Sequence, residues 1–357
     1  MLRPLVTLLA LSNLPGIGRE RLYEFFTETG LNIRALNGYC HAWHLPALAS
    51  QFPRAYERAE QHLTDVQAAG VQVTGWTEPG YPAMLLNDNY PPPPILYYTG
   101  TPVAPGEQAV AIVGTRRASP AGLEFAREVA RDLAQAGLTV VSGLALGIDG
   151  SAHRGALDVP GGRTIAVLGS GHHRIHPAAH RGLAERMVEA GGAVYSLWPP
   201  EVTAERYTFI ERNSVITGLA KIVAIIEAGS PSGALNSASH ALRQNRETFV
   251  MPGRPNDPRV RGSLELLADG FPILFSAQDI LAKFALQLQA VDTRYQYEVS
   301  TVLSEHGALT LDGLQEHCEL ALPELLEQLT YAELSGEVRR GVDGTYSARK
   351  GGATLER

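Results

Sequence analysis

The sequence predicts an α/β protein whose core is a doubly wound, mostly parallel β-sheet. From about residue 110 to residue 286, short apolar runs rich in β-branched residues alternate with helical segments, as they do when crossover helices join parallel strands. Glycine turns follow several of these runs, and ligands bind at such positions in folds of this class. The runs expected to form strands are residues 109–113, 139–142, 164–168, 193–196, 222–226 and 248–251.

Both flanks of this core have a different pattern. Residues 1–70 contain Leu-rich helical stretches and predict a small helical domain of the SAM or helix-hairpin-helix type. A Pro-rich stretch opens the core, which we expect to be an extended Rossmann-like domain over residues 71–288. Residues 289–357 predict three helices and a β-hairpin, the pattern of a winged-helix-like domain. We therefore expect three domains.

The break after the first helix, at residues 14–18 with the sequence LPGIG, has two interpretations. It resembles a helix-hairpin-helix turn, in which glycines let the backbone pass close to a phosphate. It is equally typical of a plain turn between two helices. Arg19 and Arg21 follow the turn, and they either meet DNA or lie on a solvated helix face.

The composition excludes some classes of protein and weighs against others. With 45% hydrophobic residues the chain is expected to build a globular core and not to be disordered. A net charge of −7, from 30 basic and 37 acidic side chains, argues weakly against nucleic acid as a partner, although a local cationic groove suffices to bind phosphate. Cys40 and Cys318 have no metal-ligand or disulfide spacing, and the apolar start, residues 1–11, is too short to span a membrane. We therefore expect a cytoplasmic protein without a membrane partner.

The first predicted strand leads directly into a glycine turn and the start of a helix. Gly114 and Thr115 form the turn, and Arg116 and Arg117 add guanidinium groups suited to phosphate. A tight turn with surface arginines is the alternative. Because ligands collect at the ends of parallel strands, we expect these residues to bind an anion.

The second strand ends in another loop suited to an anion, with the sequence SGLALGID. Its serine and glycines permit an anion to approach the backbone closely. The residues expected to contact the ligand are Ser142, Gly143, Leu144, Ala145 and Gly147. Asp149 and His153 are four residues apart and form either a catalytic dyad or, as we prefer, a structural support in which Asp149 caps the next helix.

The third strand ends in Gly169, Ser170 and Gly171, which precede three histidines and one arginine. No carboxylate or cysteine accompanies these histidines, so we do not expect a metal site. Planar His and Arg side chains stack on nucleobases, and Arg174 and His176 are therefore expected to contact single-stranded nucleic acid.

Two later segments complete the predicted site. Arg212 and Asn213 lie on one helix, and Ser232 and Gly233 begin another helix shortly after a strand. Arg212 is suited to neutralise phosphate, and the Ser232-Gly233 turn offers N–H groups at a helix start. We interpret Glu227 as the partner of an arginine and not as a catalytic group.

Taken together, these motifs resemble those of the DprA (Smf) family of bacterial DNA-processing proteins. No single piece is specific, but the order and spacing of the set fit over roughly residues 80–275. The matching pieces are residues 113–116 (VGTR), 142–149 (SGLALGID), 152–153 (AH), 164–171 (TIAVLGSG), 212–213 (RN) and 252–253 (PG). Leu197, Ser214 and Ser237 depart from the family pattern, and local phosphate contacts are expected to differ there.

The resemblance implies a non-catalytic protein that binds single-stranded DNA. Members of the family protect incoming DNA during natural transformation, load the RecA recombinase on it and work as homodimers. A single-stranded DNA-binding protein is a further partner to expect. Family members pair through the part that corresponds to residues 264–274, which places Leu267 and Ile273 at a dimer interface, and ordinary burial explains these apolar residues nearly as well. No cofactor is expected, because no Gly-x-Gly-x-x-Gly run occurs together with a strand and a ribose-binding acid.

Two other functions remain as alternatives. A nucleotide-processing hydrolase of the lysine-decarboxylase-like Rossmann group would use Glu227, Asp149 or His153 as acid or base, but that group's Pro-Gly-Gly-x-Gly-Thr run is absent. A winged-helix regulator would read duplex DNA with its C-terminal domain, but residues 295–350 carry ten acidic against four basic side chains, which repel phosphate. That domain is better suited to bind protein or to support a dimer.

Overall fold

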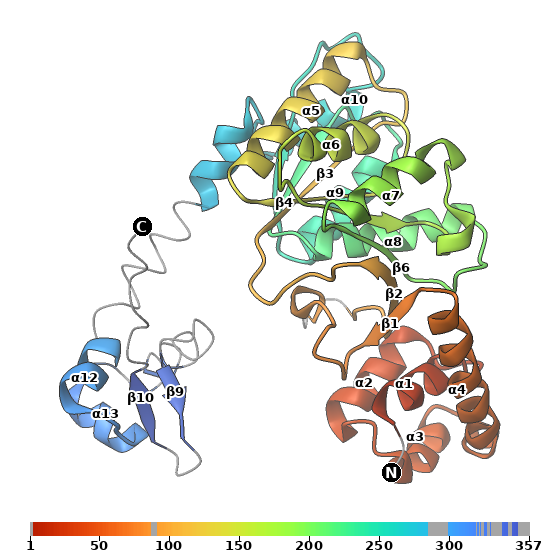
Figure 1. Cartoon of the computed structure of the whole chain (residues 1–357), viewed down its shortest axis with the longest axis vertical. Helices are drawn as coiled ribbons and strands as arrows, with labels where there is room; N and C mark the ends of the chain where they lie inside the picture. The colour runs from red at the N-terminus through yellow and green to blue at the C-terminus, as the bar shows by residue number, and fades with distance from the viewer. Residues whose placement is uncertain are drawn as a thin grey trace. The chain divides into compact units, whose positions relative to one another are not determined.

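The computed structural model describes residues 3–86, 91–284, 299–318, 320, 322, 325–326, 329, 338–341 and 345–348. The chain divides into two compact units, residues 1–280 and residues 281–357 (Figure 1). Within the described residues, no helix is both long enough and apolar enough to cross a membrane.

The first unit is built around one large mixed sheet. Its strands, in the part of the chain that the structure describes, are β1 (Gln72–Gly75), β2 (Ile95–Gly100), β3 (Ala109–Gly114), β4 (Thr139–Ser142), β5 (Thr164–Leu168), β6 (Ala193–Ser196), β7 (Ile222–Ile226) and β8 (Glu247–Val250). Their order across the sheet is β1-β2-β6-β5-β4-β3-β7-β8. The six strands from β6 to β8 are parallel, whereas β2 pairs antiparallel with both β1 and β6.

The parallel part confirms the predicted fold class, because each expected run is a strand within one residue of its predicted ends. The strands are buried on both faces, as the near-continuous apolar runs require. The crossover helices of this part are α5 (Pro120–Gln135), α6 (Ile148–Leu157), α7 (Arg181–Glu189), α8 (Arg206–Gly218) and α9 (Gly233–Arg243), followed by α10 (Arg261–Ala268). Helices α5, α6 and α7 pack beside one another, and α8 packs against α9 (Figure 1).

The N-terminal segment is helical as predicted. Its helices are α1 (Pro4–Ser12), α2 (Arg19–Thr29), α3 (Leu36–Ala42) and α4 (Phe52–Ala68). Short 3-10 turns lie at Ile33–Ala35, Pro46–Gln51, Ala83–Leu85, His172–Arg174 and Ala178–His180. Helices α1 and α4 pack against each other and against β1.

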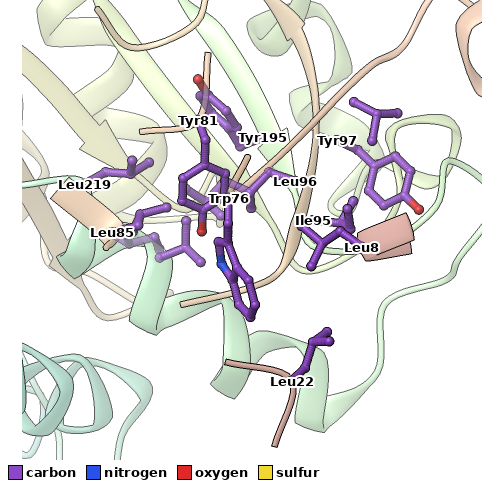
Figure 2. Packing of buried hydrophobic residues seen from close by; sticks show 14 of the residues in the cluster. Leu8, Leu22, Trp76, Tyr81, Leu85, Ile95, Leu96, Tyr97, Tyr195 and Leu219 are labelled. Atoms are coloured by element: carbon purple, nitrogen blue, oxygen red, sulfur yellow. The ribbon is translucent and has the colours of Figure 1, made fainter. Parts of the chain in front are cut away.

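The helical segment and the sheet share one hydrophobic core. Leu8 of α1 lies close to Ile95 of β2, and the Trp76 and Tyr81 side chains lie between the helices and the sheet (Figure 2). Because this cluster continues from the helices into the strands, residues 1–280 form one compact unit. That residues 1–70 fold as a domain by themselves stays a prediction.

The second unit contains α12 (Val299–His306), α13 (Leu311–His317) and the antiparallel pair β9 (Val338–Arg340) and β10 (Tyr346–Ala348). A small core that includes Val299, Leu314 and Tyr346 holds these elements together. Two helices and the hairpin agree with the predicted pattern. The third predicted helix, residues 323–334, lies largely outside the described residues, so the winged-helix-like fold stays a prediction.

Candidate nucleic-acid interface

The topology of the sheet creates a crevice at the carboxyl end of β3. From β3 the chain moves outward in one direction through β4, β5 and β6, and then crosses back to β7 on the other side of β3. In sheets of this kind the loops on the two sides diverge at such a point and leave room for a ligand. A cavity of 240 Å³ lies there, and the predicted residues that line it are Gly114, Thr115, Arg116, Ala145, Asp149, Arg212, Asn213, Ser232 and Gly233.

An aromatic ring holds the exposed arginine of this cavity. The Arg116 guanidinium lies 4.5 Å from the centre of the Phe209 ring, and the Arg212 guanidinium lies 5.8 Å from the same ring. Both distances are within the range of cation–π attraction. Arg116 is exposed while Arg212 is buried, so that one positive charge faces solvent and the other lies beneath it.

Arg212 is buried without a full set of partners. Its Nη1 donates to the Val167 carbonyl at 2.7 Å, its Nη2 lies 3.9 Å from Asp149 Oδ2, and its Nε has no hydrogen-bond partner among the described residues. Burial lowers the pKa of Arg212 to about 10, against the opposing effect of Asp149. The side chain is therefore still charged at neutral pH, and it places a buried positive charge in the wall of the cavity.

Asp149 supports the loop between β4 and α6. Its Oδ2 accepts a hydrogen bond from the Ala145 amide at 3.3 Å, and burial raises the pKa of the carboxyl although Arg212 opposes this shift. The predicted cap is wrong in position, because Gly147 is the N-cap of α6 and Asp149 lies in the first turn. The carboxylate orients the loop by holding the Ala145 amide.

Two glycines let this loop pack against its neighbours. A Cβ atom at Gly143 would lie 1.5 Å from Arg212 Nη1, and one at Gly147, where φ is +79°, would lie 2.3 Å from the Thr115 carbonyl oxygen. The side chains of Ser142 and Leu144 are fully buried, and Ser142 Oγ donates to the Ile112 carbonyl at 2.6 Å. Their expected contact with the ligand is therefore corrected: these two side chains shape the loop from inside.

The loop after β5 forms the rim of the site. Gly169, Ser170 and Gly171 are buried, and a Cβ atom at Gly169 would lie 2.6 Å from the Phe209 ring. Arg174 and His176 are exposed; Arg174 forms an ion pair with Glu201 at 3.2 Å, and the His176 ring lies 6.0 Å from the Phe209 ring. The rim thus presents Arg174 and His176 to solvent, whereas its Gly-Ser-Gly turn is packed.

The start of α9 forms the opposite wall. Ser232 is the N-cap of α9 and accepts from the Leu235 amide at 3.3 Å. Asn213 Nδ2 donates to the Gly233 carbonyl at 3.3 Å and to Asn236 Oδ1 at 3.1 Å, which fixes α9 relative to α8. The positive end of the α9 dipole therefore faces the cavity.

The two remaining structural residues have partners other than those predicted. Glu227 accepts from the backbone amide of Ser119 at 2.8 Å and from Ser119 Oγ, and within the described residues its only interaction with an arginine is a charge interaction with Arg259 that is not a close ion pair. His153 Nδ1 contacts Thr164 Oγ1 at 2.7 Å and not Asp149. Burial lowers the pKa of His153 to about 3, so the ring is neutral at pH 7. Neither contact is that of a catalytic acid or base.

Phe209 was not among the predicted site residues. It precedes Arg212 by one helical turn, and side chains three apart lie on the same face of a helix. This three-residue spacing from Arg212 could have identified Phe209 as a site residue from the sequence. Arg117, in contrast, is exposed and outside the residues that line the cavity. No group of three His, Cys, Asp or Glu side chains in the described part of the chain is placed to hold a metal ion.

The residues expected at a dimer interface differ in exposure. Leu267 is half-buried and packs against the main hydrophobic core, whereas Ile273 is 41% exposed. Phe275, two residues further on, is 69% exposed. Ile273 and Phe275 thus present apolar side chains to solvent, whereas Leu274 between them is buried.

Comparison with known sequences places the chain in a family. The family model of DNA recombination-mediator protein A matches residues 72–285. Protein Smf of Synechocystis sp. is 38% identical over 226 residues, which are 62% of this chain and 56% of that protein. Protein Smf of Escherichia coli is 35% identical over 279 residues, or 74% of each chain. The chain therefore spans little more than half of the Synechocystis relative.

Solved structures agree with this result. The X-ray structure of DNA processing protein A (DprA) from Streptococcus pneumoniae matches with a TM-score of 0.67 and 28% identity, over 78% of this chain and 97% of that one. A structure that describes the single-stranded DNA binding mode of DNA processing protein A from Helicobacter pylori matches with a TM-score of 0.52 and 28% identity, over 60% and 97%. The chain belongs to the DNA recombination-mediator protein A (DprA, Smf) family, whose members are DNA-binding recombination mediators and not catalytic enzymes.

Proposed function

We propose that the protein binds single-stranded DNA at the carboxyl edge of its parallel sheet. In this role it protects incoming DNA in the cytoplasm during natural transformation and loads the RecA recombinase on it, with a single-stranded DNA-binding protein as a further partner. The proposal rests on one observation: the cavity at the end of β3 combines the exposed guanidinium of Arg116 with the buried one of Arg212.

The chemistry of the cavity suits one phosphate of a flexible strand. Arg116 offers a bidentate contact, Arg212 adds buried charge, and the α9 N-terminus at Gly233 offers backbone N–H groups. With 240 Å³ the cavity is smaller than most pockets for drug-sized ligands, and a duplex is too wide to enter it. The exposed planes of His176 and Arg174 on the rim are suited to stack on bases of an unpaired strand. The H. pylori relative, whose structure describes a single-stranded DNA binding mode, supports the same ligand here.

Binding measurements with a charge-reversed variant test this site. We expect Arg116→Glu to weaken binding of a labelled single strand by about tenfold and to lower the slope of log affinity against log salt by about 0.7, the loss of one phosphate contact. Arg131→Glu is the matched control, because its side chain is 47% exposed near the far end of α5 and its ion pair is with the neighbouring Asp132. Unchanged affinity of a folded Arg116→Glu protein, or equal binding of duplex and single strand, contradicts the proposal.

Loading of the recombinase is a separate step. On a single strand coated with single-stranded DNA-binding protein, the wild-type protein is expected to speed the formation of RecA filaments, and Arg116→Glu is expected to lose this effect in proportion to its loss of DNA affinity. A protein that binds the strand but never accelerates filament formation would leave DNA protection as its whole role.

We propose that the homodimer forms through residues 264–274, where Ile273 is exposed next to the exposed Phe275. Ile273 is exposed without being part of the main core, so Ile273→Glu is expected to yield a folded monomer by light scattering. Leu242→Glu serves as control, since Leu242 is 69% exposed on α9. Two strand sites in one dimer raise the affinity for strands long enough to reach both. A folded Ile273→Glu protein that stays dimeric refutes this interface.

A further inference from the structure

A second cavity lies in the helical segment, apart from the residues described above. It has a volume of 760 Å³ and is lined by Asn13, Leu14, Pro15, Ser50, Gln51, Arg54, Ala55, Arg58, Ala59 and His62. One wall is the turn between α1 and α2, and the other is the face of α4 that begins at Arg54. We call it the α4 groove.

The α4 groove carries two arginines that have no ion-pair partner among the described residues. Arg54 and Arg58 are four residues apart on α4, so their side chains lie one above the other on the same helix face. Both are exposed, and neither forms an ion pair within the described residues. Like charges at this spacing repel each other. An anion bound between them removes that repulsion, so the pair is suited to a phosphate.

The rest of the α4 groove is uncharged. Ala55 and Ala59 leave its floor open, and Leu14 and Pro15 give an apolar rim. His62 Nε2 contacts the Tyr97 hydroxyl of β2 at 2.9 Å, which ties the end of the groove to the sheet. Burial lowers the pKa of His62, against the effect of Asp65, so the arginines supply the positive charge at neutral pH.

Other polar groups in the α4 groove favour a nucleotide strand over a free anion. Asn13 Nδ2 donates to the Leu9 carbonyl at 2.8 Å, so its Oδ1 is suited to accept from the N–H groups of a base, which a free anion lacks, and Gln51 is exposed beside it in the groove lining. Both arginines are exposed. Exposed guanidinium groups bind a phosphate weakly and in a salt-dependent way. Such a contact becomes effective when the ligand is already held elsewhere on the protein.

We propose that the α4 groove binds the sugar-phosphate backbone of single-stranded DNA as a second contact, beyond the cavity at the end of β3. This inference rests on the proposed function, because a strand held at Arg116 raises the effective concentration of phosphates at Arg54 and Arg58. It assigns a binding role to the start of the turn at residues 14–18, because Leu14 and Pro15 line the groove.

Strand length separates the two contacts in an experiment. We measure binding of a labelled strand of about 8 nucleotides, enough for one site, and of about 60 nucleotides, enough for both. The double variant Arg54→Glu/Arg58→Glu is expected to bind the long strand about tenfold more weakly and the short strand within about twofold, with a salt slope reduced by about 1.4 on the long strand only. Arg34→Glu is the matched control, an exposed arginine of the helical segment outside the groove.

The outcomes distinguish this inference from the proposed function. If Arg116→Glu weakens both strands and the double variant weakens neither, the groove inference is wrong and the proposed function stands. If Arg116→Glu changes neither strand, the proposed function fails. Arg54→Gln/Arg58→Gln, which removes charge without reversing it, is expected to show about half the loss in log affinity, and circular dichroism checks that each variant is folded. A groove that binds a duplex of the same length as tightly overturns the assignment to single strands.

Discussion

The two edges of the parallel sheet use an arginine and a carboxylate in opposite ways. At the amino edge, Arg163 Nε lies 2.6 Å from Glu107 Oε1. Arg163 also donates to the carbonyls of Thr101 at 2.9 Å and of Gly191, and Glu107 accepts from Thr139 Oγ1 at 2.5 Å. This pair is mostly buried, with side chains 21% and 13% exposed, and each guanidinium nitrogen of Arg163 donates at least one hydrogen bond.

At the carboxyl edge, the corresponding arginine and carboxylate lie further apart and have fewer hydrogen-bond partners. Arg212 and Asp149 are 5% and 7% exposed, yet their closest charged atoms are 3.9 Å apart, and Arg212 Nε has no partner among the described residues. A buried charge with full partners holds a structure together, whereas one with missing partners costs stability and is available to a ligand. The amino edge therefore supports the fold, whereas the carboxyl edge is arranged to receive an anion.

Removing the arginine of the amino edge is expected to have the largest effect. Arg163→Met leaves the Glu107 carboxylate buried without its main partner, so the free energy of unfolding in urea is expected to fall by about 3 kcal/mol. The affinity of the folded protein for single-stranded DNA is expected to stay unchanged. A loss below about 1 kcal/mol would mean that this pair is not the support that its geometry indicates.

Replacing the arginine of the carboxyl edge by methionine is expected to weaken binding of single-stranded DNA and to change stability little. Arg212→Met removes a cation with an incomplete set of partners, and Asp149, whose pKa burial already raises, takes up a proton. Stability is expected to change by less than about 1 kcal/mol, while the affinity for a single strand falls about tenfold. Strong destabilisation with unchanged affinity would reverse the comparison between the edges.

The parallel strands could be predicted from sequence because each is a continuous apolar run, which buried parallel strands require. Strands β1 and β2 were not predicted. β1 has four residues, and β2 follows a run of prolines that is typical of a linker. Their place in the sheet depends on antiparallel pairing of β2 with β6, which no local pattern records.

The location of the site could also be predicted, but not the direction of each side chain. The glycine turns do mark the strand ends, and Arg116 is exposed there. Ser142 points inward because its Oγ donates to the Ile112 carbonyl of the neighbouring strand β3, and Leu144 is buried as well. The burial of Arg212 follows from its packing against Gly143, a contact between segments far apart in the sequence.

Glu227 offers a smaller test. It lies at the carboxyl edge, but its carboxylate has hydrogen-bond partners, as the Glu107 carboxylate has at the amino edge. Its two bonds to Ser119 hold the residue that caps α5. Glu227→Gln is expected to lower the free energy of unfolding by about 1 kcal/mol, the value of a helix cap, and to leave DNA affinity unchanged. A tenfold loss of affinity in a stable variant would place Glu227 with the ligand-binding groups.

The smallest expected effect is the pH dependence of the amino edge. Burial opposes ionisation of Glu107, but hydrogen bonds from Arg163, Thr139 and the Ala104 amide outweigh it and hold the pKa below its usual value of 4.5. A lowered pKa in the folded state means that the charged form adds stability above pH 4.5, and that this contribution is lost as the pH falls through the folded pKa. In the Arg163→Met variant the effect of burial outweighs the remaining hydrogen bonds, so the Glu107 pKa is expected to rise. Protonation of Glu107 at low pH then removes its unpaired buried charge.

The gap in unfolding free energy between the wild type and Arg163→Met is therefore expected to narrow between about pH 7 and about pH 3.5, because other carboxylates titrate alike in both proteins. Arg127→Met is the control: its pair with Asp158 is exposed, with side chains 53% and 36% accessible, and is expected to give a small gap at every pH. Urea titrations across this range measure both gaps. A gap for Arg163→Met that stays constant with pH would show that Arg163 supports the edge through its backbone carbonyl partners alone, and that the carboxylate is not the group that distinguishes the two edges.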